Sequence, residues 1–197
     1  MIRNQLRPAI LLTLVFILVT GLVYPGAVTG IATIVFPNQA RGSLVTVNGR
    51  VIGSSLIGQQ FTEPWYFHPR PSAAGNGYDA TASGGTNKGP TDRKLADTLI
   101  AGAAAAAESS GVPKGKVPTD MATSSGSGLD PHISPANALY QVARVAAARG
   151  VDSSKVRQLV QQHIEGRQLG FLGEPRVNVL ALNIALDSVA PKQRQTH

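Results

Sequence analysis

The chain contains no cysteine among its 197 residues, and aromatic residues make up only 5% of it. Without cysteine there are no disulfide bonds and no thiolate metal sites. The four histidines are dispersed and form no H-x-x-x-H pair, so the sequence predicts no metal centre. Charged residues, 15% of the chain, are scattered rather than gathered into a block. Nucleic-acid-binding surfaces cluster their positive charge, so we expect no nucleic-acid partner.

Long uncharged runs are also scarce, except at one place near the N-terminus. No charge interrupts the 33 residues from Pro8 to Ala40, and 13 residues between Ala9 and Ile31 are Leu, Ile, Val or Phe. A membrane-spanning helix needs about 20 apolar residues. A cleaved signal peptide is the alternative, but its apolar core is shorter, and no clear A-x-A site follows this run. We therefore predict a transmembrane anchor over residues 9–36, loosened in its second half by Pro25 and Gly26.

The flanking charges predict the orientation of this anchor. Arg3 and Arg7 precede it closely, whereas Arg41 and Arg50 follow at a greater distance. Because positive residues close to a span favour the cytoplasm, residues 1–8 are expected to form a cytoplasmic tail. Residues 37–197 are then expected to form one exported domain.

Strand signals come early in this domain and helix signals come late, which predicts an α+β fold. A β-hairpin is expected around Asn48-Gly49, a dipeptide preferred in tight turns. The run DMATSS (120–125) is interpreted as a short buried strand. Helices are expected after a cap at Thr91 or Asp92 to near Gly111, from Ser134 to Gly150, from Asp152 or Ser153 to just before Gly166, and after Asn178.

Three adjacent aromatic residues, Trp65, Tyr66 and Phe67, are framed by prolines at positions 64, 69 and 71. In a chain with so few aromatics, such a cluster either fills the core or contacts a partner. The core is the favoured interpretation.

A glycine-rich loop offers a nucleotide-binding candidate: Ser83, Gly84, Gly85, Thr86, Asn87 and Lys88. A phosphate-binding P-loop has its lysine after the last glycine and at the start of a helix. Here Lys88 comes before Gly89, and Pro90 follows. The signal is weak, and a surface loop or a partner contact is favoured.

A second loop, SSGSGLDPHIS, brings serines close to Asp130 and His132 in sequence. This grouping permits a hydrolase hypothesis, in which one serine, Asp130 and His132 would form the catalytic set. The loop lacks the nucleophile-elbow pattern G-x-S-x-G. The hypothesis is therefore kept only as an alternative.

Several blocks together resemble one known family: YFHPRPSAAGNGYDATASGGTN, SSGSGLDPHISPANALYQVARVAAARG and GEPRVNVLALNIALD. They resemble the small C subunit of the Kdp-type high-affinity potassium-transporting P-type ATPase of bacteria, nearly end to end. The resemblance implies a single-pass protein of the bacterial plasma membrane. It also implies three partners: a P-type ATPase subunit, a potassium-channel-like subunit and a small membrane peptide. The absence of D-K-T-G and TVGYG motifs agrees with a non-catalytic accessory subunit.

The resemblance further implies an assembly factor and catalytic chaperone that raises the ATP affinity of the ATPase subunit. No tightly bound cofactor is expected, only the ATP of the complex. If residues 37–197 are exported, they cannot form part of a cytoplasmic ATP site. Either the effect on ATP is allosteric, or the domain caps the channel-like subunit at the ion entrance. The candidate partner contacts are Trp65, Tyr66, Phe67, Arg70, Ser127, Gly128 and Asp130.

Overall fold

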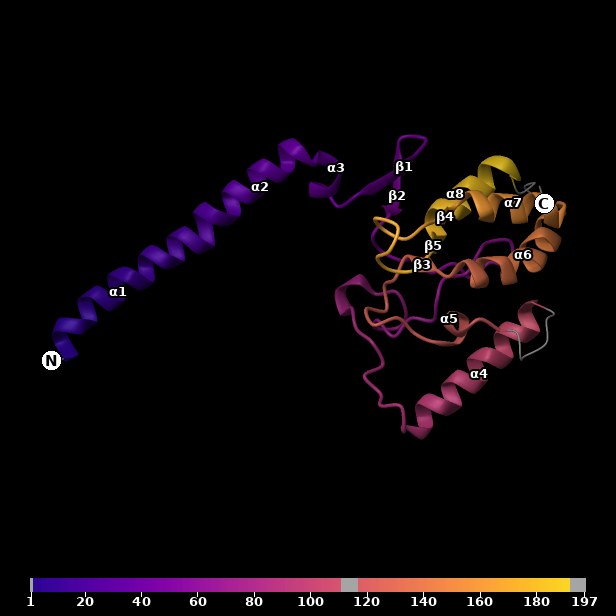
Figure 1. The fold of residues 1–197 in the computed structure, drawn as a ribbon, viewed down its shortest axis with the longest axis horizontal. Coiled ribbons are helices and arrows are strands. Elements are labelled where there is room, and N and C mark those ends of the chain that lie inside the picture. The colour runs from indigo at the N-terminus through magenta and orange to yellow at the C-terminus, as the bar shows by residue number, and fades with distance from the viewer. Residues whose placement is uncertain (1, 111–116, 192–197) are drawn as a thin grey trace. The chain divides into compact units, whose positions relative to one another are not determined.

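The computed structural model describes residues 2–110 and 117–191. The chain divides into two compact units, residues 1–54 and 55–197, and each is described by itself. Figure 1 labels the elements of both units.

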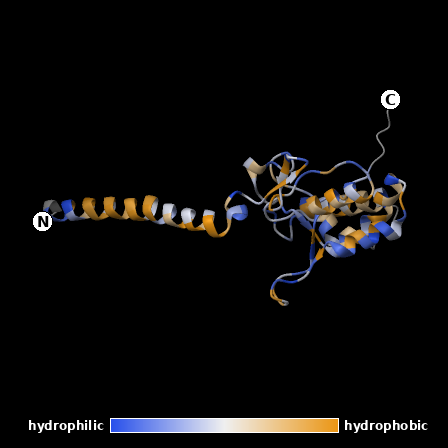
Figure 2. Ribbon diagram, turned by 90° about the horizontal axis from the view of Figure 1, so that it is seen from above, coloured by the Kyte–Doolittle hydropathy of each residue, from blue (hydrophilic) through white to orange (hydrophobic). Residues whose placement is uncertain are grey.

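A continuous helix runs through the apolar stretch of the first unit. It consists of α1 (Ile2–Leu18), a π-helical turn η1 (Val19–Val23) and α2 (Tyr24–Val35). The stretch Asn4–Val35 is long and apolar enough to cross a membrane, and its apolar residues dominate the colouring of this helix in Figure 2. The π turn directly precedes Pro25, which has no N–H to donate and crowds the carbonyl four residues earlier. The proline therefore loosens the helix on its N-terminal side, near the middle of the span, rather than throughout the second half.

The predicted hairpin follows a short helix, α3 (Pro37–Ala40). Strands β1 (Leu44–Val47) and β2 (Arg50–Ser54) pair antiparallel, with Val47 opposite Arg50. Asn48 and Gly49 both have positive φ, at 51° and 78°. This is the geometry of the two-residue turn that favours Asn-Gly, so the prediction is confirmed.

The helices of the second unit are α4 (Arg93–Ser110), α5 (Thr119–Ala122), α6 (Pro135–Arg149), α7 (Ser153–Gln162) and α8 (Val179–Val189). Predicted cap residues hold the first turns of α4, α6, α7 and α8. The side chains of Asp92, Ser134, Asp152 and Asn178 accept backbone N–H groups at 2.7–3.0 Å. The expected end of α4 at Gly111 lies outside the described residues.

Two predictions are wrong: that a helix continues to just before Gly166, and that DMATSS is a strand. A three-stranded antiparallel sheet, ordered β3 (His132–Ile133), β5 (Arg176–Asn178), β4 (Ile164–Glu165), lies late in the chain. Ile164 pairs with Val177, so α7 ends at Gln162 and does not continue to Gly166. The run DMATSS is not a strand, because residues 119–122 form α5, with Asp120 in the first turn, where a carboxylate suits a helix N-terminus.

Helices α6, α7 and α8 enclose the core together with β5. Val145, Val160 and Leu182 are completely buried, and Phe67 from the proline-framed segment joins them. One apolar helix followed by small sheets and helices confirms the α+β prediction. The irregular loops lie outside this core, so hydrogen bonds rather than apolar packing must hold them in place.

Candidate functional site

The proline-framed segment 64–71 is held by side-chain amides instead of by a neighbouring strand. Asn183 on α8 accepts the Phe67 N–H at 2.9 Å and donates to the Phe67 carbonyl at 3.0 Å. Gln141 on α6 makes the same pair of bonds to His68, at 2.7 and 3.0 Å. Both amides are buried. Because the prolines cannot donate to a sheet ladder, these amides satisfy the backbone in the core.

The aromatic cluster divides between core and surface. Phe67 is fully buried, as the core interpretation predicts, whereas Trp65 and Tyr66 are half-buried. The Tyr66 hydroxyl donates to Asp187 at 2.8 Å, and the Arg149 guanidinium lies 5.1 Å from the Tyr66 ring centroid. Burial and the bond to Asp187 raise the pKa of Tyr66, so it stays a neutral donor. Trp65 and Tyr66 thus present a fixed surface.

Two irregular loops, residues 70–87 and 123–131, lie against each other, and we call them the paired loops. Arg70 joins them: its guanidinium donates to Asp130 at 3.3 Å, to the Thr123 carbonyl at 3.3 and 3.4 Å, and to the Ser124 carbonyl at 3.2 Å. Its side chain is only 24% exposed. Arg70 therefore acts mainly as a clamp inside the domain, and what it offers a partner is the position of the loops.

The hydroxyl groups of Ser72 and Tyr78 add one further bond between the paired loops and two within the first loop. Ser72 Oγ donates to the Gly128 carbonyl at 2.6 Å and accepts the Tyr78 N–H at 2.8 Å. The Tyr78 hydroxyl donates to the Arg70 carbonyl, and burial raises the pKa of Tyr78. The loops are thus tied along their length by buried or half-buried hydrogen bonds, which stabilise a single arrangement.

Gly128 permits the closest approach of the two loops. It has a φ of 68°, and a Cβ added there would lie 2.6 Å from the Ala74 nitrogen and 2.8 Å from the Gly84 carbonyl oxygen. A side chain at this position would meet backbone on the opposite loop, which cannot turn aside. The fold requires glycine here for both reasons.

Five nucleotide candidates, Ser83 to Asn87, lie in one of the paired loops, and Lys88 directly follows it. Ser83 Oγ and the Gly84 N–H both donate to the Ser127 carbonyl, at 3.0 and 2.9 Å. These two donors therefore hold the other loop, although a phosphate site would need them. Thr86, Asn87 and Lys88 are exposed, and Gly85 lies against Gly126. The geometry favours the surface-loop interpretation over a phosphate cradle.

Asp130 and His132 come together, but without a serine nucleophile between them. Asp130 Oδ1 accepts the His132 N–H at 2.9 Å and lies 3.5 Å from His132 Nδ1. Burial raises the pKa of Asp130, but the hydrogen bonds from His132 and the charge of Arg70 outweigh it, and the pKa lies below its ordinary value. The Ser134 hydroxyl donates to Asp120 at 3.0 Å, and Ser127 Oγ accepts the Leu129 N–H. The hydrolase hypothesis is not supported.

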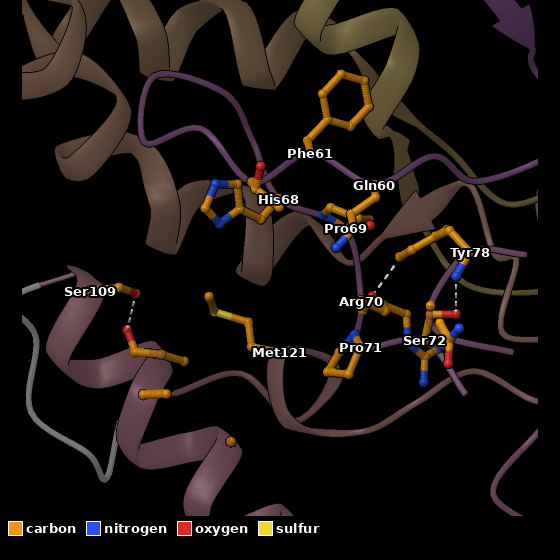
Figure 3. Close-up of a pocket in the computed structure, with 16 residues that line it drawn as sticks. Gln60, Phe61, His68, Pro69, Arg70, Pro71, Ser72, Tyr78, Ser109 and Met121 are labelled. Carbon is orange, nitrogen blue, oxygen red and sulfur yellow. Dashed lines mark hydrogen bonds between the residues drawn. The ribbon is translucent and has the colours of Figure 1, made fainter. Parts of the chain in front are cut away.

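A cavity of about 560 Å³ opens beside the paired loops (Figure 3). Its walls are the proline-framed segment with His68 and Arg70, the loop residue Tyr78, and the small residues of α4. Burial and the nearby charge of Arg144 lower the pKa of His68, which is therefore neutral at physiological pH. Within residues 2–110 and 117–191, no three His, Asp or Glu residues are placed to hold a metal ion.

Sequence reasoning missed three polar residues that lie beside the paired loops and bond to each other: Asp120, Asn137 and Gln141. Asp120 accepts hydrogen bonds from the Ser134 backbone and from the Asn137 side chain, at 2.7 and 3.0 Å. Asn137 in turn accepts from Gln141 at 2.7 Å. The only signal was the presence of polar residues on the buried face of a helix, at positions 137 and 141 of α6. Asn137 and Gln141 are four residues apart, but their other partners, Asp120 and His68, lie 17 and 73 residues away and could not be read from spacing.

An apolar helix long enough to cross a membrane, followed by a separately folded α+β domain, is the architecture of a membrane-anchored protein. The comparisons with known proteins agree. Residues 6–188 match the family model KdpC, described as K+-transporting ATPase, c chain. The chain is 58% identical over 188 residues to a potassium-transporting ATPase KdpC subunit of Gemmatimonas aurantiaca, covering 95% of this chain and 94% of the relative. It is 54% identical to the protein of the same name in Koribacter versatilis, with 96% and 97% covered. The chain belongs to the KdpC family, and it is a subunit of a transport ATPase rather than an enzyme by itself.

Proposed function

We propose that this chain stabilises a potassium-transporting P-type ATPase complex from the exported side of the bacterial plasma membrane. The observation that carries the proposal is the paired loops, which hydrogen bonds between the loops hold in one arrangement. Long irregular loops are uncommon in compact domains and are often binding surfaces. A surface that is already ordered loses less entropy on docking. The names of the relatives identify the complex as a potassium-transporting ATPase.

The docking face consists of the exposed parts of the paired loops and the neighbouring aromatic residues. Ser127 and Thr86 are exposed there, as is Lys88 directly after the first loop, and Trp65 and Tyr66 are half-buried. Arg70, Gly128 and Asp130 position this face from within. Its partners are proposed to be the channel-like and ATPase subunits, with the small membrane peptide beside the anchor.

The orientation follows from the charges around the anchor. Arg3 and Arg7 lie close before the span, which favours a cytoplasmic N-terminus. The chain has no cysteine, so single cysteines report the side directly. A membrane-impermeant maleimide should label Asp97→Cys on intact spheroplasts and Gln5→Cys only after permeabilisation. The reverse pattern would overturn the orientation.

We propose that the effect on ATP affinity is indirect. An exported domain does not reach a cytoplasmic ATP site, so it must bind two states of the complex with different affinity. The anchor offers a connection between the two sides, with its π-helical turn at Val19–Val23. Calorimetry of the chain alone with millimolar ATP should show no heat. Saturable heat would favour direct binding at Ser83–Lys88 instead.

Co-purification tests the function itself. The tagged chain is isolated in mild detergent from potassium-starved cells, its partners are identified by mass spectrometry, and ATPase activity is assayed on the same eluate. We expect a P-type ATPase, a channel-like protein and potassium-stimulated turnover. His132→Ala serves as the control and should leave both recovery and turnover unchanged. A lone chain in the eluate, from membranes that contain those partners, would contradict the proposal.

A further inference from the structure

The loop between β4 and β5, residues 166–173, carries large apolar side chains into solvent. Leu169 is 83% exposed, Phe171 68% and Leu172 47%. We call these three residues the apolar tip. In Figure 1 the loop extends from the sheet formed by β3, β5 and β4. The docking face described above includes none of these residues.

The backbone of this loop is arranged to present the tip. Gln168 and Leu172 form an isolated antiparallel bridge, which makes the loop a narrow hairpin. Leu169 and Gly170 have φ values of 53° and 83° at the turn. A leucine rarely adopts positive φ, because its Cβ crowds the backbone. A leucine held in this uncommon conformation at an exposed turn is a reason to look for a function of its side chain.

Charged residues surround the base of the tip but cancel each other. Arg167 pairs with Glu174 at 2.8 and 2.9 Å, and Arg176 pairs with Glu165 at 2.9 Å. The tip is thus apolar above a polar collar of zero net charge. This arrangement matches a lipid interface, where apolar groups enter the acyl boundary and polar groups remain among the headgroups.

The tip also lies near Ser55, where the chain enters the second unit. We call the preceding residues 36–54, which connect the helix to this unit, the tether. The Ser55 carbonyl, at the start of the second unit, accepts a hydrogen bond from Asn178 Nδ2 at 2.9 Å. Asn178 ends β5, the strand that follows the tip. Asn178 is six positions after Leu172, and this length of chain spans at most roughly 20 Å.

The tether itself is short. In the first unit, Leu44 pairs with Ser54, so the hairpin brings the chain back and adds little length. Eight residues lie between Val35 and Leu44, and four of them are in α3. With helical and extended rises, they span roughly 25 Å. The end of the span and Ser55 are therefore joined by at most this length of chain, which permits the apolar tip to reach the bilayer surface.

We propose that the apolar tip inserts into the phospholipid interface beside the anchor, as a second membrane contact of this chain. The inference requires that the anchor spans a membrane, and it does not depend on the docking of the paired loops. Because attachment by the anchor already holds the domain near the bilayer, the tip needs only weak affinity to remain inserted.

The absence of native cysteine permits a direct test. The full chain carries one cysteine, Phe171→Cys, labelled with an environment-sensitive fluorophore, and is reconstituted alone into vesicles of zwitterionic phospholipid. We expect a blue-shifted emission and loss of fluorescence when nitroxide-labelled lipids are included. Leu172→Cys repeats the measurement on a second position, with circular dichroism to confirm the fold. Ile100→Cys on α4 is the matched control: Ile100 is an exposed apolar residue, 69% exposed, and should show neither change.

Two outcomes would overturn the proposal. A label at position 171 that is in water in vesicles but is shielded when the chain is within the purified ATPase complex would assign the tip to a protein partner. A label that is in water in both preparations would show that the tip contacts neither. Failure of the complex to form leaves the vesicle measurement intact, so the two proposals can fail separately.

Discussion

The helical core and the paired loops are both ordered, but by different interactions. In the core, α6, α7 and α8 bury apolar side chains such as Val145 and Leu182. In the paired loops, a few side chains of one loop, above all Arg70 and Ser72, donate hydrogen bonds to backbone carbonyls of the other loop. The core therefore depends on many small contributions, whereas the loops depend on single polar groups and on one glycine. We expect changes in the core to affect global unfolding, and changes in the loops to affect local opening.

The largest expected effect is in the core. Leu182→Ala removes a completely buried side chain and leaves a cavity, which should lower the free energy of unfolding by about 2–5 kcal/mol. Urea unfolding of the full chain in detergent, followed by fluorescence of Trp65, measures this, because the chain has one tryptophan. Leu169→Ala, at an 83% exposed position, is the control and should change it by less than about 0.5 kcal/mol.

Asn183→Ala tests how the core holds the proline-framed segment, which leads into the first of the paired loops. The substitution leaves the N–H and the carbonyl of Phe67 without their buried partner, which should cost about 2–4 kcal/mol in the same assay. Asn76→Ala, at an exposed position in the paired loops, should be close to neutral. An equally small effect of both substitutions would show that the amide does not hold the proline-framed segment.

Gly128→Ala should separate the loops from the core. Its positive φ alone costs about 1–2 kcal/mol, and the contact with Ala74 adds to it. Because the strain is local, we expect faster amide hydrogen exchange in residues 70–87 and little change in the urea midpoint. Gly126→Ala is the matched control, since Gly126 has open space and no positive φ. A large shift of the midpoint by Gly128→Ala would contradict the distinction between the two regions.

The smallest effect concerns pH and His68, which borders both regions. Burial and the charge of Arg144 lower its pKa below the ordinary value of 6.5. The folded chain therefore binds this proton less readily than the unfolded chain. The stability contribution is present above pH 6.5 and is lost as the pH falls through the lower, folded pKa. In His68→Gln the urea midpoint should decline less over the mildly acidic range; an unchanged decline would assign it to other groups.

The same contrast explains how much the sequence could predict. The caps at Asp92, Ser134, Asp152 and Asn178, and the Asn48-Gly49 turn, are local signals, and each was found at its predicted place. The strand at Ile164 was missed because its pairing with Val177 lies 13 residues away and has no local signature. The run DMATSS was misassigned because six residues without a repeating apolar pattern do not distinguish a short strand from a helical turn.

The candidate site shows the same limit. The sequence indicated both loops and most of their residues, but not that Arg70 and Gly128 serve the loops themselves. Those roles depend on contacts with Thr123 and Ala74, which lie more than 50 residues away in sequence. Such contacts become visible only when the chain is folded.

The central claim is that the paired loops dock onto a partner subunit, and crosslinking tests it most directly. A photoactivated crosslinker is attached to the single cysteine of Thr86→Cys in the assembled complex in membranes, with Ser188→Cys on α8 as the exposed control. We expect an adduct between Thr86→Cys and a partner subunit, and none from Ser188→Cys. An adduct from position 188 alone would place the interface elsewhere on the domain and contradict the docking role of the paired loops.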